Sequence, residues 1–205
     1  MKNGFFYEEQ AAREGFRAVC GIDEAGRGPL AGPVFAAAVI LPEHFAVEGV
    51  DDSKKLSPKK RESLFGEITK NAAAYGIGFA TEREIDGINI LQATFLAMRR
   101  AFGALGVRPD LALVDGNRPP PLGVETRTIV HGDALSESIA AASILAKVSR
   151  DRLMLRVDEL YPQYGFAKHK GYGTAYHIEM LRKYGPCPVH RKTFLKKILG
   201  EPEDG

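Results

Sequence analysis

The sequence predicts one α/β domain with a mixed sheet covered by helices. Three strand-like segments come first, and further strand-like segments then alternate with segments of helical periodicity. This order is typical of a sheet with helices on its faces. The chain has 205 residues, of which 44% are hydrophobic and 26% charged, and a chain of this size buries a sizeable core without disulfides or structural metals.

Five segments have the composition of strands. Residues 33–42 form an apolar run that is bounded by prolines and is too short for a typical helix, which predicts a buried strand. The other four strands are predicted over residues 16–23, 73–81, 111–114 and 125–130.

Helices are expected between and after these strands. Ser57 followed by Pro58 is typical of a helix N-terminus, because serine caps free N–H groups and proline is tolerated in the first turn. We expect this helix to run to about Lys70. Further helices are predicted over residues 5–14, from 88 to about 103–106, over 136–160, and on both sides of the turn at 185–188.

Charge is distributed unevenly along the chain. The formal net charge is only +2, but residues 161–199 carry eight Lys or Arg against one Glu. Such a segment is either a solvated face or a surface for nucleic acid. The first residues lack an apolar signal core, no apolar run is long enough to span a bilayer, and Cys20 and Cys187 lie far apart. We therefore expect a reduced, cytoplasmic protein without a membrane partner.

A glycine-rich turn follows two acids in the stretch GIDEAGRGPLAG, residues 21–32. Its spacing differs from that of dinucleotide-binding loops, and a strand rather than a helix follows it. A nucleotide cofactor is therefore disfavoured. From the residues alone, a plain hairpin turn is the favoured interpretation of the glycines.

Four carboxylates follow three of the predicted strands: Asp23, Glu24, Asp115 and Asp133. A solvated strand end would explain any one of them, but several carboxylates at one sheet edge repel each other unless a cation neutralises them. Oxygen ligands suit Mg²⁺ and Mn²⁺. Two such ions, about 4 Å apart, can clamp the attacking and leaving oxygens of a phosphoryl displacement. We therefore predict a two-ion site for Mn²⁺ or Mg²⁺.

A series of motifs along the chain resembles a known family. The motifs are GIDEAGRGPLAGPV, DDSKKLS, INILQAT, LVDGN, GDALSESIAAASILAKVSRDR, FAKHKGYGT and GPCPVHRKTF, and the resemblance covers the chain from about Phe6 to Phe194. In this order they resemble bacterial type 2 ribonuclease H (ribonuclease HII). The resemblance implies a ribonuclease H-like fold with a mixed five-stranded sheet flanked by helices. It also implies a catalytic core over 1–165, a basic helical substrate-binding segment of the same domain over 166–199, and a polar tail over 200–205.

The same resemblance implies an activity. The family hydrolyses the RNA strand of RNA–DNA hybrids and cuts on the 5′ side of single ribonucleotides in duplex DNA, leaving 3′-hydroxyl and 5′-phosphate ends. Its metal-binding carboxylates fall on Asp23, Glu24, Asp115 and Asp133, the four residues that follow strands. We expect a monomer whose partners are RNA–DNA hybrids and ribonucleotide-containing duplex DNA.

Substrate contacts are also implied. Gly26-Arg27-Gly28 matches the turn that reads the ribose 2′-hydroxyl with main-chain groups, since glycine lets the backbone approach closely. Tyr172 matches a tyrosine that stacks at the ribonucleotide junction. Weaker candidates for contacts with phosphates or bases are Lys54, Lys55, Asn89, Gln92, Lys147, Arg150, Lys168, His169 and Lys170. A solvated helix face or loop is the alternative for each, and Lys147 can instead pair with Asp151.

Two other functions are compatible with parts of the sequence. A resolvase or integrase with the same fold would share the acids but would have no reason to carry the GRG and GYG elements. A non-catalytic nucleic-acid-binding module would use the basic residues of 161–199 and would need no carboxylate cluster.

Overall fold

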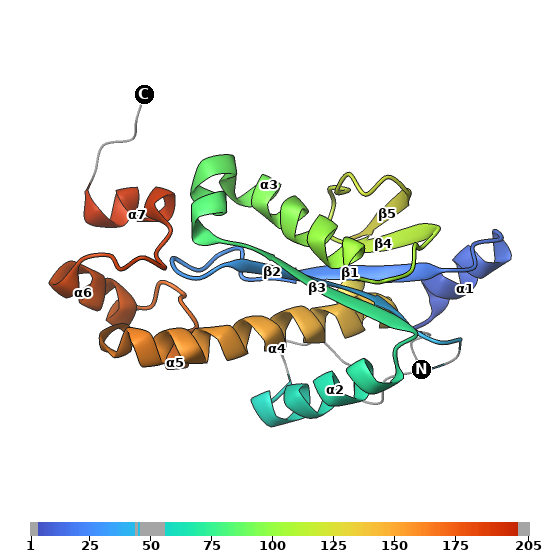
Figure 1. Ribbon diagram of the computed structural model, residues 1–205, viewed down its shortest axis with the longest axis horizontal. Helices are drawn as coiled ribbons and strands as arrows, with labels where there is room; N and C mark the ends of the chain where they lie inside the picture. Colours follow the sequence, from blue (N-terminus) through green and yellow to red (C-terminus); the bar gives the residue numbers. More distant parts are fainter. Residues whose placement is uncertain (1–3, 44, 46–55, 201–205) are drawn as a thin grey trace.

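The computed structural model describes residues 4–43, 45 and 56–200 and contains a five-stranded sheet (Figure 1). The strands are β1 (Val19–Ala25), β2 (Val34–Ile40), β3 (Ala74–Ala80), β4 (Leu111–Asp115) and β5 (Glu125–Ile129). Their order in the sheet is β3-β2-β1-β4-β5. The β1–β2 and β2–β3 pairs are antiparallel, whereas β1–β4 and β4–β5 are parallel. The predicted mixed five-stranded sheet is therefore confirmed.

Helices cover both faces of the sheet. They are α1 (Phe6–Arg13), α2 (Pro58–Asn71), α3 (Glu82–Gly103), α4 (Glu137–Leu160), α5 (Phe166–His169), α6 (Ala175–Tyr184) and α7 (Lys192–Leu199). Figure 1 shows α3 on one face and α4 and α2 on the other, with α6 and α7 at the left of the view, where α4 ends. Within the described ranges, no helix combines the length and the apolar character that a bilayer crossing requires.

Successive side chains of β1 point to opposite faces of the sheet. Ile22 belongs to the apolar core under α3, whereas Asp23 hydrogen-bonds to Ser143 of α4 on the opposite face. A Cβ atom added to Gly21 would lie 2.1 Å from the carbonyl carbon of Ser138. The helix can therefore lie directly on β1 only because glycine presents no side chain there.

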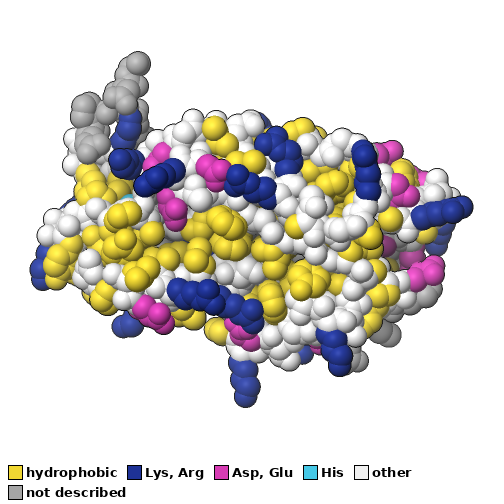
Figure 2. Space-filling view, viewed as in Figure 1, with side chains coloured by type: hydrophobic (Ala, Val, Ile, Leu, Met, Phe, Trp, Pro, Cys, Tyr) yellow, Lys and Arg dark blue, Asp and Glu magenta, His cyan; other side chains and the backbone are white. Residues whose placement is uncertain are grey.

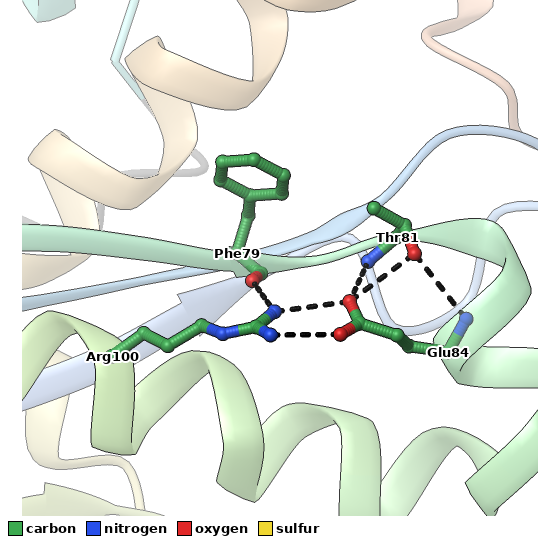
Figure 3. A network of polar contacts seen from close by, with 4 residues as sticks. All are labelled: Phe79, Thr81, Glu84 and Arg100. Carbon is green, nitrogen blue, oxygen red and sulfur yellow. Dashed lines mark hydrogen bonds and ion pairs between the residues drawn. The ribbon is translucent and has the colours of Figure 1, made fainter.

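The N-terminus of α3 lies at Glu82 rather than at the predicted residue 88. Thr81 and Glu84 form a capping box: the Glu84 N–H donates to Thr81 Oγ1 (3.3 Å), and the Thr81 N–H donates to Glu84 Oε2 (2.8 Å). Arg100 donates to Glu84 Oε1 and to the Phe79 carbonyl, both at 2.8 Å (Figure 3). The Arg100 bond, aided by the Thr81 N–H, lowers the pKa of Glu84 to about 2.

A kink at Asn89 explains why the sequence predicted the start of this helix at residue 88 rather than at Glu82. Asn89 has φ 63° and ψ 165° inside α3, and its Oδ1 accepts hydrogen bonds from Leu91 N (3.0 Å) and Gln92 N (3.2 Å). The side chain thus caps the second half of the helix, in the way that Asn commonly replaces a main-chain acceptor. The apolar periodicity from residue 88 marks this second half and not the whole helix.

The C-terminal helices pack against the end of α4 and the loop between β1 and β2. The shared apolar cluster contains Leu30, Ala31, Met154, Val157, Tyr164, Phe166, Met180, Leu181 and Leu195. Main-chain hydrogen bonds reinforce this contact, since Leu30 N donates to Gly171 O (2.8 Å) and Gly32 N donates to Val189 O (2.9 Å). Residues of the basic C-terminal third therefore help to fix a loop that begins next to Asp23 and Glu24.

Two buried histidines link the C-terminal loop to Tyr172. His190 Nδ1 accepts from Cys187 N–H (2.9 Å), so its Nε2 carries the proton and donates to His177 Nε2 (3.0 Å). His177 Nδ1 in turn donates to the Tyr172 carbonyl (2.9 Å). This chain of bonds requires both imidazole rings to be neutral.

The neutral histidines make the fold sensitive to acid. Burial lowers the pKa of His190 to about 4 and also lowers that of His177. Histidine in the unfolded chain titrates near 6.5, so between these values the unfolded state binds more protons and stability falls as pH decreases. The His190 contribution, present in full above pH 6.5, corresponds to roughly 3 kcal/mol.

We therefore expect the free energy of unfolding to be lower at pH 4.5 than at pH 7. In His190→Asn, the difference between the two pH values should be smaller. Urea unfolding followed by circular dichroism at the two pH values measures it. His131→Asn is the matched control, because His131 is exposed and its φ of 59° suits asparagine. An equal pH dependence in His190→Asn and the wild type would refute the prediction.

Candidate active site

A cleft of about 510 Å³ opens where the parallel strands β1 and β4 end. Its lining residues are Asp23, Glu24, Ala25, Gly26, Arg27, Gly28, Arg61, Asp115, Ser143, Lys147, Arg150 and Tyr172. The cleft therefore brings together three of the predicted carboxylates, the whole Gly26-Arg27-Gly28 turn (hereafter the GRG turn), and Tyr172. These residues come from parts of the chain that are far apart in sequence.

Asp23 lies at the centre of the acidic group. It is only 5% exposed, and its Oδ1 accepts a 2.6 Å hydrogen bond from the Glu24 N–H. Burial, followed by the charges of Glu24 and Asp115, raises the pKa of Asp23 well above its ordinary value, although the Ser143 hydroxyl bond opposes this. The site thus holds negative charges that repel each other in a poorly hydrated place.

Asp133 lies beside this group. It sits in the short 3₁₀ turn Gly132–Ala134 and is 8% exposed. The preceding N–H, that of Gly132, donates to Asp115 Oδ1 at 2.7 Å. Asp133 itself lines a separate cavity of about 30 Å³ with Gly4 and Glu137. The structure therefore places three predicted carboxylates in the cleft and the fourth next to it.

The chemistry of these oxygens fits a hard divalent cation. Carboxylates and a hydroxyl are the ligand types that Mg²⁺ and Mn²⁺ prefer, and a cation would offset the repulsion that raises the pKa of Asp23. In the part of the chain that the structure describes, no three His, Cys, Asp or Glu side chains are already arranged to hold an ion. The fit therefore rests on the donor types and on the charge of the site.

The GRG turn and Tyr172 lie next to each other in the cleft. Gly26 has φ +97°, which favours glycine. A Cβ atom on Gly28 would lie 3.7 Å from Tyr172 Cε1, and the Tyr172 side chain is 46% exposed. Arg27 reaches back to Glu24, with Nη1 at 3.3 Å from Oε1. The turn is thus placed between the acidic group and an accessible aromatic ring.

A second groove of about 430 Å³ continues from the cleft between α2 and α4, since Arg61 and Lys147 line both. It also contains Arg152, Lys168 and Lys170. Figure 2 shows Lys and Arg side chains over the region of α4. Lys147 Nζ is 2.8 Å from Asp151 Oδ1, so the intrahelical pair considered from the sequence is present. Three of the predicted basic contacts, Lys147, Lys168 and Lys170, share this groove.

Other sequence candidates are placed differently. Arg150 is 1% exposed, and its guanidinium donates to the carbonyls of Pro33 and Ala31, both at 3.1 Å. Although Arg150 is one of the residues around the cleft, its guanidinium is not placed as the accessible phosphate or base contact predicted from the sequence, because it turns into the protein and satisfies main-chain acceptors. The His169 ring is also hydrogen-bonded to main-chain groups, since its Nε2 donates to Tyr164 O and its Nδ1 accepts from Gly171 N.

Asn89 and Gln92 are exposed on α3 and belong neither to the cleft nor to the groove. Asn89 instead caps the second half of its helix. Lys54 and Lys55 lie outside the described residues.

Three residues of the site are missing from the sequence-based set. Arg61 and Ser143 line the cleft. Arg191 is fully buried behind the GRG turn and donates to the carbonyls of Gly26 and Arg27. The only sequence signal for Arg191 is its place in the motif GPCPVHRKTF, to which no role is assigned from the sequence.

The chain is similar to proteins of one known family. Residues 20–197 match the Ribonuclease HII family. A ribonuclease HII of Caldicellulosiruptor bescii is 58% identical over 198 residues, which cover 97% of this chain and 96% of the relative. The ribonuclease H2 structure from Pyrococcus horikoshii OT3 is 29% identical with a TM-score of 0.73, covering 89% of this chain and 97% of the other. The RNase HII of Archaeoglobus fulgidus, solved in complex with PCNA, is 27% identical with a TM-score of 0.74, covering 86% and 94%.

The family match spans most of the chain, and the relative from C. bescii aligns over nearly its full length. The chain therefore belongs to the ribonuclease HII family of metal-dependent endonucleases.

Proposed function

We propose that the chain hydrolyses the RNA strand of RNA–DNA hybrids and cuts on the 5′ side of single ribonucleotides in duplex DNA. The observation that carries this proposal is the single cleft that contains Asp23, Glu24, Asp115 and the GRG turn. Its acids can serve hydrolysis of a phosphodiester, and its turn can test the sugar next to that bond. A resolvase-like enzyme would use the acids but would gain nothing from the GRG turn.

Asp23, Glu24 and Asp115, with Asp133 beside them, would hold one or two Mn²⁺ or Mg²⁺ ions. Bound there, the metal supplies a Lewis acid that neutralises charge on the phosphate oxygens and activates water. The chain contributes the positions of the oxygens: the Glu24 N–H and Ser143 hydroxyl orient Asp23, and the Gly132 N–H orients Asp115. These bonds hold the carboxylates in place before substrate arrives.

Recognition of the ribonucleotide is assigned to the GRG turn and Tyr172. Main-chain N–H groups of a glycine turn can approach a sugar hydroxyl without steric conflict, and the 2′-hydroxyl is the group that distinguishes RNA from DNA. The half-exposed ring of Tyr172 lies next to Gly28, where it can stack on the neighbouring nucleotide.

The basic groove is assigned to the phosphate backbone. Arg61, Lys147, Lys168 and Lys170 continue from the cleft along α2 and α4, and such contacts hold a duplex in register without reading its sequence. We further propose that residues 166–199 form a substrate-binding part of the same domain, because their apolar side chains share a cluster with Leu30 and Met154.

Neutralising one central carboxylate should nearly abolish cleavage. Metal-ion stabilisation is worth several kcal/mol, so we expect Asp23→Asn and Asp115→Asn each to lower turnover about 100-fold or more, with substrate affinity largely kept. Gel assays of cleavage and fluorescence anisotropy measure the two effects. Glu179→Gln removes an exposed charge on α6 and serves as the control. Normal turnover of Asp23→Asn in Mg²⁺ or Mn²⁺ would exclude the assigned site.

A duplex with one ribonucleotide should be cut on the 5′ side of that nucleotide, whereas the all-DNA duplex of the same sequence should stay intact. The reason is that only the first offers a 2′-hydroxyl to the GRG turn. End-labelled strands resolved on a denaturing gel show both the rate and the position of the cut. Equal cleavage of both duplexes would instead favour a resolvase-like enzyme.

Loss of basic side chains from the groove should weaken the salt dependence of binding. Each lost phosphate contact reduces the slope of log K against log salt concentration by about 1, so we expect a reduction of about 2 for the double variant Lys147→Ala/Lys168→Ala. Anisotropy titrations over a range of KCl concentrations measure the slope. Lys70→Ala, at an exposed lysine near the end of α2 and outside the groove, is the control. If the slope of the double variant is unchanged, the groove is only a solvated face.

A further inference from the structure

Arg191, immediately before α7, is a buried arginine with three main-chain partners. Its side chain is 0% exposed. Nε donates to Gly32 O (2.9 Å), Nη1 to Arg27 O (2.8 Å) and Nη2 to Gly26 O (2.6 Å). Two of the three acceptors therefore belong to the GRG turn, and the third lies at the end of the same loop.

Holding this charge inside the protein is costly. Burial and the nearby guanidinium of Arg150 lower the pKa of Arg191 to about 9, while the charges of Glu82 and Asp86 partly oppose this effect. Arg191 thus remains a cation at neutral pH. A buried charge is tolerated when it is well hydrogen-bonded, and here each of the three guanidinium nitrogens donates to a main-chain carbonyl.

The hydrogen bonds of Arg191 also fix where the N–H groups of the turn point. In a planar trans peptide the C=O and the following N–H point in opposite directions. The Gly26 carbonyl shares its peptide with the Arg27 N–H, and the Arg27 carbonyl shares its peptide with the Gly28 N–H. Both carbonyls are held toward buried Arg191, so both N–H groups point away from it, to the side where residues 26–28 line the cleft.

We propose that Arg191 is a positioning residue for ribose recognition: it holds the GRG turn so that two adjacent main-chain N–H donors face the 2′-oxygen of the substrate. This inference rests on the proposed function of the turn. Arg191 itself touches neither the substrate nor the carboxylates, and it acts only through the main chain of residues 26–28.

Arg191 is itself held firmly. Its N–H donates to Leu30 O (2.9 Å), and the following residues are tied to Asp86, which accepts from Lys192 N (2.9 Å) and Thr193 N (3.0 Å). The preceding residue, His190, begins the chain of bonds that ends at the Tyr172 carbonyl. One dipeptide therefore anchors both elements that are assigned to the ribonucleotide.

The test compares two affinities in an Asp23→Asn background, in which cleavage is blocked. The quantity measured by anisotropy is the Kd of an all-DNA duplex divided by the Kd of the same duplex with one ribonucleotide. One or two hydrogen bonds to the 2′-oxygen predict a ratio of about fivefold or more. We expect Arg191→Met to bring the ratio to within about twofold of one, and Arg191→Lys to give an intermediate value, because an ammonium lacks the planar fork of the guanidinium.

Arg100→Met is the control, since Arg100 also donates to a main-chain carbonyl but lies outside the cleft (Figure 3). It should lower the thermal midpoint without changing the ratio, which separates general destabilisation from a loss of positioning. An unchanged ratio in Arg191→Met overturns the inference. If Arg191→Met does not fold, a full ratio in Arg191→Lys overturns it instead. A ratio of one in Asp23→Asn alone overturns the ribose-reading role of the turn, and the inference with it.

Discussion

Repulsion among Asp23, Glu24 and Asp115 is the constraint around which the site is built. The chain places these carboxylates at one edge of the sheet although burial and mutual repulsion raise the pKa of Asp23. The parallel pairing of β1 with β4 holds them there, with Ile22 opposite Val114 just before the acids. The contact of α4 with β1 at Gly21 adds Ser143 as a partner for Asp23. Neutral groups thus hold these carboxylates in place.

Two buried positive charges lie close to this group of carboxylates. Arg150 and Arg191 are buried on the inner side of the loop that joins β1 to β2, and both donate to its carbonyls. The two guanidiniums lie close to each other, since the charge of Arg150 contributes to the lowered pKa of Arg191. The GRG turn is therefore bonded to buried cations and lines the same cleft as the acids. Its main-chain dipoles are oriented by the cations.

The sequence was sufficient for most of the fold because local patterns mark its elements. The proline-bounded apolar run predicted β2, and Ser57-Pro58 predicted the start of α2, where Ser57 Oγ accepts from Lys60 N. The start of α3 was missed although its signal, Thr81 followed three residues later by Glu84, is a capping-box pattern. Because the helix is kinked at Asn89, its apolar periodicity is continuous only after the kink, and the sequence therefore predicted only the second half of α3.

The site was predictable where each residue acts by its own chemistry and unpredictable where its role depends on distant partners. The strand-end position of Asp23 and Asp115 is visible locally, and both line the cleft. The roles of Arg150 and Arg191 depend on which carbonyls lie within reach after folding, and no pattern along the chain gives that. The charge of Arg150 predicted a contact with phosphates or bases, but the helix is buried on the side where Arg150 points.

The bond between Arg191 Nη2 and the Gly26 carbonyl joins residues 165 positions apart. Contacts of such separation form late, because the intervening chain must first be brought together. During synthesis, which proceeds from the N-terminus, the acids and the GRG turn emerge long before the arginine that holds the turn. The strands can assemble and place the carboxylates while the turn still lacks its anchor. The order of synthesis thus separates in time the placement of the first carboxylates from the anchoring of the GRG turn, and the anchoring comes last.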